Sequence, residues 1–167
     1  QCADPAAENA VTALYEKSAE LLGTDYMDFY WIHNPMDTPK WVTELIPLAK
    51  SGKIGKIGLS NHSLAESKEA ADILAKEGLK ISAIQNHYSL LNRSSETSGI
   101  LDYCKENDII FFSYMVLEQG ALTGKYDMKH PFPEDSDRGR TYNPMLPELE
   151  KLNKGLEEIA ERHHAAT

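Results

Sequence analysis

The chain has 167 residues, of which 41% are hydrophobic and 26% charged, and its formal net charge is −9 at pH 7. A chain of this length is expected to form one domain over residues 1–167 with a hydrophobic core. An acidic chain is a poor partner for nucleic acid or anionic lipid, because both bind basic surfaces. We find no apolar run long enough to cross a membrane and no leader segment, so we expect a cytoplasmic protein without a membrane partner.

The chain has two cysteines, Cys2 and Cys104. Their number and spacing predict neither a disulfide framework nor a metal site. Cys104 falls in an amphipathic stretch and is expected to be a small core residue in a reduced protein.

Helix and strand patterns alternate along the chain. Asp4-Pro5 is expected to start the first helix, which Gly23 ends. Its face is formed by Val11, Leu14, Tyr15, Ser18, Leu21 and Leu22. Further helices are expected at about 38–51, 64–77, 97–106 and 147–164, and strands at about 26–33, 53–59, 81–85 and 109–114. A capping box of Ser63 and Glu66 is expected to start the third helix.

The segment Tyr26–Pro35, with the sequence YMDFYWIHNP, is rich in aromatic and β-branched residues. Its side chains do not alternate cleanly between apolar and polar. Such a strand is typical of a parallel sheet covered by helices on both faces, so this strand is expected to be buried on both sides.

The expected strands end at polar residues or tyrosine, namely His33, Asn61, Gln85 and Tyr114, which are 28, 24 and 29 residues apart. Strict alternation predicts an α/β fold with a parallel sheet, and a near-constant repeat suggests βα units of one barrel, in which strand ends meet on one face. Four strands do not close a barrel of eight, so either the sheet is open or the chain is part of something longer.

The segment at about 119–147 is polar and rich in proline, and we expect a long loop there. A loop of that length in a compact domain is usually functional or mobile.

Four stretches in this order, LLGTDYMDFYWIHNP, KSGKIGKIGLSNHS, IQNHYSLLNR and FFSYMVLEQGALTGKY, closely resemble the aldo-keto reductase family. The resemblance runs from the helix before the family's fourth strand to the helix after its seventh. It implies a partial (β/α)8 TIM barrel with four parallel strands. It also implies an oxidoreductase that reduces a small-molecule carbonyl to an alcohol with NAD(P)H, usually NADPH.

The resemblance also implies roles for single residues. His33 matches the active-site histidine that hydrogen-bonds the substrate carbonyl, and Tyr114 matches the tyrosine that stacks on the nicotinamide ring. The nicotinamide carboxamide would be bound by Ser60, Asn61 and Gln85. The segment over the cofactor pyrophosphate would be formed by Leu117, Gln119, Gly120 and Lys125. Without the resemblance, His33 would be read as a structural hydrogen-bonding residue, Ser60 and Asn61 as a helix-capping turn, Tyr114 as a core aromatic and Lys125 as a solvated loop charge.

The family's catalytic tyrosine, lysine and aspartate match no stretch of this sequence, so the isolated chain is expected to be inactive. Met115-Val116 also stands where the family usually has Ser-Pro. A second hypothesis is a non-catalytic half-barrel, a binding or assembly module that pairs through its sheet edges with a second copy or a complementing chain. A third, an unrelated doubly wound protein, would need a glycine-rich loop between strand and helix, which Gly52, Gly55 and Gly58 do not form.

Overall fold

The structure is a computed structural model that describes residues 6–165. The described chain divides into two compact units. Unit 1 comprises residues 6–88 and 92–114, and unit 2 comprises residues 89–91 and 115–165. Whether they form the single domain expected from the sequence stays a prediction.

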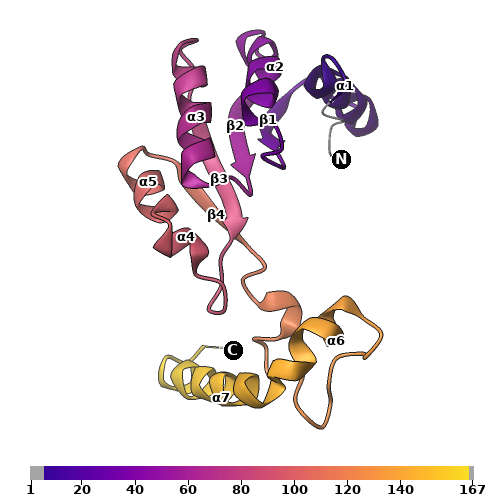
Figure 1. Cartoon of the computed structure of the whole chain (residues 1–167), viewed down its shortest axis with the longest axis vertical. Helices are drawn as coiled ribbons and strands as arrows, with labels where there is room; N and C mark the ends of the chain where they lie inside the picture. The colour runs from indigo at the N-terminus through magenta and orange to yellow at the C-terminus, as the bar shows by residue number, and fades with distance from the viewer. Residues whose placement is uncertain (1–5, 166–167) are drawn as a thin grey trace. The chain divides into compact units, whose positions relative to one another are not determined.

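Unit 1 contains a sheet of four parallel strands in the order β1-β2-β3-β4, as the alternating pattern predicts (Figure 1). The strands are β1 (Met27–Ile32), β2 (Ile54–Ser60), β3 (Ile81–His87) and β4 (Ile110–Tyr114). Because the strands are parallel and adjacent, their carboxyl ends all lie at the same end of the sheet. The candidate residues predicted at strand ends are therefore brought to one side.

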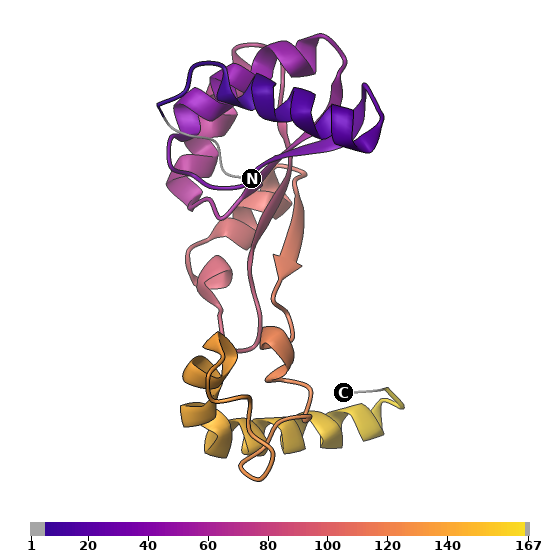
Figure 2. The same cartoon turned by 90° about the vertical axis from the view of Figure 1, so that its right-hand side faces the viewer.

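The helices of unit 1 lie along one face of this sheet (Figures 1 and 2). They are α1 (Ala10–Leu22), α2 (Thr38–Lys50), α3 (Leu64–Ala75), α4 (Ser94–Thr97) and α5 (Ile100–Glu106). The single helix predicted at 97–106 is wrong, because Gly99 has a φ of 82° and separates α4 from α5. The expected start at Asp4-Pro5 lies outside the described residues, and the capping box of Ser63 and Glu66 is confirmed.

The core of unit 1 lies between the helices and the covered face of the sheet. Leu45, Leu59, Leu74 and Ile84 are fully buried there. Leu21 and Leu22, predicted on the buried face of the first helix, are 74% and 70% exposed. They occupy the last turn of α1, and Gly23 ends the helix directly after them in a left-handed conformation.

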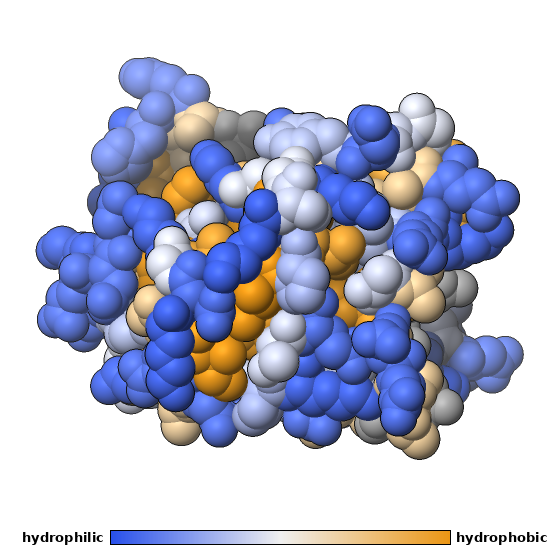
Figure 3. Space-filling view, turned by 90° about the horizontal axis from the view of Figure 1, so that it is seen from above, coloured by the Kyte–Doolittle hydropathy of each residue, from blue (hydrophilic) through white to orange (hydrophobic). Residues whose placement is uncertain are grey.

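The prediction that the first strand is buried on both faces is wrong. In β1 only Ile32 is buried, because the helices of unit 1 cover one face of the sheet and no described element of unit 1 covers the other. On β1, Phe29 stacks on Trp31 at 5.6 Å between ring centroids, and Phe112 of β4 packs edge-on against Trp31 at 5.5 Å. Phe112 is 39% exposed. Figure 3 shows patches of hydrophobic residues at the surface among hydrophilic ones.

Unit 2 contains η1 (Glu118–Gly120), α6 (Asp137–Tyr142), η2 (Asn143–Met145) and α7 (Leu146–Arg162). The long loop predicted at about 119–147 is therefore partly helical. Ser136 accepts a hydrogen bond from the amide of Gly139 and caps α6. Unit 2 has a hydrophobic core of its own. It is formed by Ala121, Leu122, Phe132, Tyr142, Leu146 and Leu149. None of the helices within the described residues is long and apolar enough to cross a membrane.

Candidate active site

Hydrogen bonds through Asn61 join the carboxyl ends of β1, β2 and β4. The Asn61 side-chain nitrogen donates to the carbonyl oxygen of His33 at 2.9 Å and contacts Ser60 Oγ at 3.2 Å. The hydroxyl of Tyr114 donates to Asn61 Oδ1 at 2.6 Å. Asn61 itself has a φ of 62°, a left-handed conformation that is uncommon outside glycine but tolerated by asparagine. The structure thus brings three predicted strand ends into one hydrogen-bonded group.

Gln85 joins this group through the sheet itself. Gln85 lies directly opposite Ser60 in the register of β2 and β3, and its carbonyl oxygen accepts from the Asn61 amide at 3.0 Å. Ser60 is only 3% exposed. Among the described residues, the side-chain amide of Gln85 makes no hydrogen bond. It is therefore a donor and acceptor that remains available.

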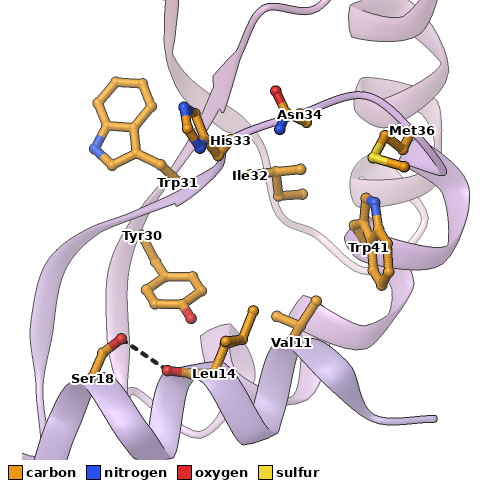
Figure 4. Close-up of a pocket in the computed structure, with 10 residues that line it drawn as sticks. All are labelled: Val11, Leu14, Ser18, Tyr30, Trp31, Ile32, His33, Asn34, Met36 and Trp41. Carbon is orange, nitrogen blue, oxygen red and sulfur yellow. Dashed lines mark hydrogen bonds between the residues drawn. The ribbon is translucent and has the colours of Figure 1, made fainter. Parts of the chain in front are cut away.

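His33 follows β1 directly, and its side chain is exposed. Together with Tyr30 and Trp31 it lines a cavity of about 340 Å³ between β1, α1 and α2 (Figure 4). The wall opposite is formed by α1, from which Val11, Leu14 and Ser18 line the cavity. The structure therefore joins His33 to Asn61 and Tyr114 through its main chain, whereas its imidazole lines a different cavity from theirs.

Asn61 and Tyr114 line a second cavity, of about 360 Å³, at the ends of β2, β3 and β4. The ring of Tyr114 stacks on His87 at 5.4 Å between centroids with an interplanar angle of 23°. One face of the tyrosine ring is thus occupied by a protein ring. Asn86, also on this cavity, donates from its side chain to the carbonyl of His62 at 2.9 Å, which ties β3 to the turn after β2.

His62 is a residue that sequence reasoning did not single out. It is 1% exposed, and its Nδ1 lies 2.8 Å from the carbonyl oxygen of Ser60. Because a carbonyl only accepts, Nδ1 carries the proton, and Nε2 is a buried acceptor without a partner in the structure. Burial lowers the pKa of His62, since the imidazolium would lose hydration there. A histidine directly after a strand-end Ser-Asn pair was the only available signal.

The four residues predicted to contact the cofactor pyrophosphate lie in unit 2. Leu117 and Gln119 are exposed, and Gly120 has a φ of 103°. Lys125 is exposed, with its ammonium 5.4 Å from the ring centroid of Tyr126. Gln119 has a φ of 52°, which strains a residue with a side chain. Leu117 directly precedes η1, Gln119 and Gly120 lie in it, and Lys125 lies in the segment that follows it.

A buried carboxylate beside that turn also escaped sequence reasoning. Glu118 is 3% exposed and accepts hydrogen bonds from Ser89 Oγ and, at 2.8 Å, from the hydroxyl of Tyr142. Burial and this carboxylate raise the pKa of Tyr142 to about 12, so the phenol stays a donor. Ser89 and Tyr142 are 29 and 24 residues from Glu118 in the chain, so no local sequence pattern predicts these hydrogen bonds.

The strand-end group has the chemistry that a nicotinamide carboxamide requires. A carboxamide both donates and accepts, and the side-chain amide of Gln85 and the hydroxyl of Ser60 supply groups of both kinds, while Asn61 Oδ1 can accept a second hydrogen bond beside the one from Tyr114. The free amide of Gln85 and the rigid tethering of Asn61 are the observations that fit such a ligand. The residues present therefore suit the cofactor implied by the resemblance.

Comparison with known proteins gives the family. The sequence profile described as the Aldo/keto reductase family matches residues 3–167. An L-glyceraldehyde 3-phosphate reductase of Escherichia coli O157:H7 is 30% identical over 136 residues, which are 78% of this chain and 38% of that protein. The aldo-keto reductase yakc [NADP(+)] of Schizosaccharomyces pombe is 32% identical over 157 residues, which are 90% of this chain and 43% of that protein.

A solved structure of a glycerol dehydrogenase from Gluconobacter oxydans superposes with a TM-score of 0.79 at 26% identity, covering 94% of this chain and 48% of that one. The chain thus spans less than half the length of these proteins. The predicted fold class, four parallel strands of an α/β barrel, is confirmed. On the family profile and the relatives together, the chain belongs to the aldo/keto reductase family.

Proposed function

We propose that this chain is the nicotinamide-positioning part of an NADPH-dependent reductase that converts a small-molecule aldehyde or ketone to an alcohol. The observation that carries the proposal is the chain of hydrogen bonds from Tyr114 through Asn61 to His33. These bonds fix the ends of three strands relative to one another. Hydride transfer requires such fixed geometry, because the groups that hold the cofactor and the substrate must be held at defined positions. The names of relatives support the rest, one being specified for NADP(+) and another for an aldehyde phosphate.

NADPH, when bound, supplies the hydride. The chain's own residues have binding and orienting tasks. Ser60, Asn61 and Gln85 hold the carboxamide and so select which ring face is presented, and Tyr114 packs against the ring. The imidazole of His33 donates a hydrogen bond to the carbonyl oxygen, which orients and polarises it. In unit 2, Leu117, Gln119, Gly120 and Lys125 contact the pyrophosphate.

We further propose that proton donation requires polypeptide beyond these residues. The tyrosine, lysine and aspartate that serve this step in the family match nothing in the sequence. Without a proton donor, the alkoxide formed on hydride transfer has no partner at the right place. The 167-residue chain alone is thus proposed to bind cofactor weakly and to be inactive.

The assay is loss of NADPH absorbance in the presence of a simple aldehyde. The purified 167-residue chain is expected to give no turnover, whereas a longer polypeptide of the same sequence with the remaining βα units is expected to turn over. In that longer protein, His33→Ala is expected to lower kcat/KM at least about a hundredfold, which is the range of one general acid–base or polarising group. Turnover unaffected by His33→Ala, or turnover by the 167-residue chain itself, would contradict the proposal.

A non-catalytic assembly module is the second candidate, and one observation favours it. Within the described residues, β1 and β4 each pair on one side only, and the aromatic residues Phe29, Trp31 and Phe112 lie on the uncovered sheet face. Such edges and faces promote association with another chain. Under this alternative, the chain self-associates and NADPH does not bind.

A further inference from the structure

The second cavity, at the ends of β2, β3 and β4, contains polar atoms that the proposed function does not use. Besides Asn61 and Tyr114, it is lined by residues of the turn after β2, of β3 and of the helices α3, α4 and α5. Gln85, which is proposed to hold the nicotinamide carboxamide, does not line it. Side chains on a strand point alternately to opposite faces, so Gln85 and its neighbour Asn86 lie on opposite sides of β3. A ligand in this cavity would therefore meet a largely different set of atoms.

His62 gives the cavity a buried acceptor whose tautomer is fixed. The residue is 1% exposed, and its Nδ1 donates to the carbonyl oxygen of Ser60 at 2.8 Å, which leaves Nε2 unprotonated. Nε2 has no hydrogen-bond partner in the described part of the chain. Burial lowers the pKa of His62, so the ring stays a neutral acceptor at neutral pH. Because a buried acceptor without a donor is destabilising, a ligand that donates to Nε2 gains affinity from it.

Asn86 supplies a second acceptor, and its orientation is fixed as well. Its side-chain nitrogen donates to the carbonyl oxygen of His62 at 2.9 Å. Because a carbonyl only accepts, the nitrogen takes that position and Oδ1 takes the other. Oδ1 is buried and has no hydrogen-bond partner among residues 6–165. The bond thus connects the two residues and leaves one unused acceptor on each.

A third acceptor in the wall of the cavity is charged. Glu66 is partly buried in the first turn of α3. Its Oε2 accepts from the backbone amide and from the hydroxyl of Ser63, both at 2.7 Å, whereas Oε1 accepts no hydrogen bond within the described chain. The hydrogen bonds from Ser63 lower the pKa of Glu66, so the carboxylate is ionised at neutral pH. One carboxylate oxygen therefore remains for a ligand.

The serine hydroxyls of α4 add acceptors to the cavity, not donors. Ser94 Oγ donates to Asn92 Oδ1 at 2.7 Å, and Ser95 Oγ donates to the carbonyl oxygen of His87 at 3.4 Å. A hydroxyl whose proton is engaged offers only its lone pairs. Within the described chain, no lysine or arginine lines this cavity. Its chemistry therefore favours a cationic donor over an anion.

We propose that this cavity binds the primary ammonium group of a small molecule, held by His62 Nε2, Asn86 Oδ1 and Glu66 Oε1. An ammonium group has three N–H donors and one positive charge, which match two neutral acceptors and one carboxylate. The inference goes beyond the proposed function, because the cofactor carries no ammonium group and reduction of a carbonyl does not require one.

The test uses methylammonium as the probe, titrated into the 167-residue chain at neutral pH. Binding is followed by nitrogen NMR of His62 Nε2, whose resonance moves when this atom accepts a hydrogen bond, and by the backbone amides. Tetramethylammonium, which has the same charge and no N–H group, is the matched control ligand. We expect it to bind at least about tenfold more weakly than methylammonium, because it makes none of the charge-assisted hydrogen bonds.

Two variants test the assigned acceptors. Glu66→Gln is compared with Glu69→Gln, which removes the same charge from an exposed position on the same helix. Glutamine can replace glutamate in the capping box, so α3 is expected to remain folded. We expect methylammonium to bind about tenfold more weakly to Glu66→Gln and less than about twofold more weakly to Glu69→Gln. His62→Asn, which keeps a donor toward Ser60 and removes Nε2, is expected to weaken binding about threefold. Circular dichroism shows whether each variant remains folded.

Equal affinity for the two ions, or equal weakening by the Glu66 and Glu69 changes, would overturn the site. Either result would mean that the cation is attracted only by the net charge of −9. A His62 Nε2 resonance that does not move at saturating methylammonium would overturn it as well. Methylammonium binding with the expected dependence, without any binding of NADPH, leaves this site standing and removes the proposed cofactor. The opposite pair of results removes this site and leaves the proposed cofactor.

Discussion

Asn61 connects more of the candidate active site than any other single residue described above. Its amide donates toward β1, its carbonyl oxygen accepts from β4, and its own backbone continues β2. A side chain that bonds on both sides fixes its own orientation, so the group it belongs to is ordered before a ligand binds. Preorganisation of this kind reduces the cost of binding.

Tyr114→Phe tests this connection. The change removes the 2.6 Å bond to Asn61 and keeps the ring stacked on His87. We expect the free energy of unfolding to fall by about 1 kcal/mol, the usual net value of a partly buried hydrogen bond. Urea unfolding measures it. The matched control is Tyr88→Phe, which removes an exposed bond to Glu96 and is expected to cost less. Equal losses for both variants would contradict the account.

The buried His62 predicts how stability depends on pH. Because its pKa is lowered in the folded chain, the unfolded chain takes up a proton first as the pH falls. The stabilising contribution of neutral His62 is therefore fully present above the unfolded pKa of about 6.5 and is lost progressively below it. Glu66, whose pKa is lowered by hydrogen bonds from Ser63, titrates in a more acidic range.

Unfolding by urea between about pH 5 and pH 8 isolates this effect, since the histidine range lies there. His62→Asn keeps a donor near the Ser60 carbonyl and removes the titrating ring. We expect the free energy of unfolding of the variant to vary less over this range than that of the unchanged chain. His163→Asn, at an exposed position, is the control and is expected to retain the original pH dependence. A pH dependence that survives in His62→Asn would be the contrary result.

At the scale of elements, the packing of the Trp31 indole of β1 against β2 depends on a glycine. A Cβ atom built on Gly58 would lie 2.3 Å from the ring of Trp31. Gly58→Ala therefore forces the indole or the strand to move, and we expect a loss of about 1–3 kcal/mol in the free energy of unfolding. Thermal and urea unfolding both report it.

Gly155→Ala is the matched change in the other direction. Gly155 lies inside α7, and nothing lies within 4 Å of an added Cβ. The same substitution should stabilise the protein there by about 0.5–1 kcal/mol. Alanine has a higher helix propensity than glycine, and it leaves the unfolded chain less conformational freedom to lose on folding. If both alanine variants are destabilised alike, steric contact with Trp31 is not the cause at Gly58.

The order of helices and strands could be predicted because it depends on local patterns. The Ser63 and Glu66 capping box and the helix end at Gly23 were confirmed, since their hydrogen bonds join neighbours in sequence. The break at Gly99 and the helix α6 were missed. A four-residue helix and a six-residue helix are too short to give a period, and α6 depends on tertiary contacts of Phe132 and Tyr142.

The candidate site was predictable in part for the same reason. Residues at strand ends are predictable once the strands are parallel, and Asn61, Gln85 and Tyr114 do meet along one edge. The networks that hold them were not predictable. The bonds from Asn61 to His33 and from Glu118 to Ser89 join residues 28 and 29 apart, which no local pattern encodes.

At the scale of the whole molecule, we expect the sheet face that unit 1 leaves uncovered to govern association of the chain in solution. Phe112 is 39% exposed on that face, next to Trp31. An exposed aromatic patch beside unpaired strand edges favours association. We expect the sedimentation coefficient of the 167-residue chain to rise with protein concentration.

Phe112→Glu should reduce this rise, because a carboxylate on the uncovered face opposes its burial against another chain. The control is Met128→Glu in unit 2, where Met128 is 59% exposed and lies away from the sheet in sequence. This variant is expected to associate as the unchanged chain does. An unchanged chain that stays monomeric at all concentrations would rule out the assembly module and leave the reductase proposal untouched.

The central claim is that the strand-end group of unit 1 binds a nicotinamide cofactor. Its most direct test is calorimetric titration of NADPH into the 167-residue chain and into Asn61→Ala, Gln85→Ala and Asn107→Ala. Asn107 is the matched control, since its side chain only caps α5 by a bond to Tyr103. The account predicts measurable binding, weakened about tenfold or more by each of the first two changes, which remove a hydrogen bond to the ligand, and unaltered by the third. No binding to the unchanged chain, or equal affinity in all three variants, would contradict it.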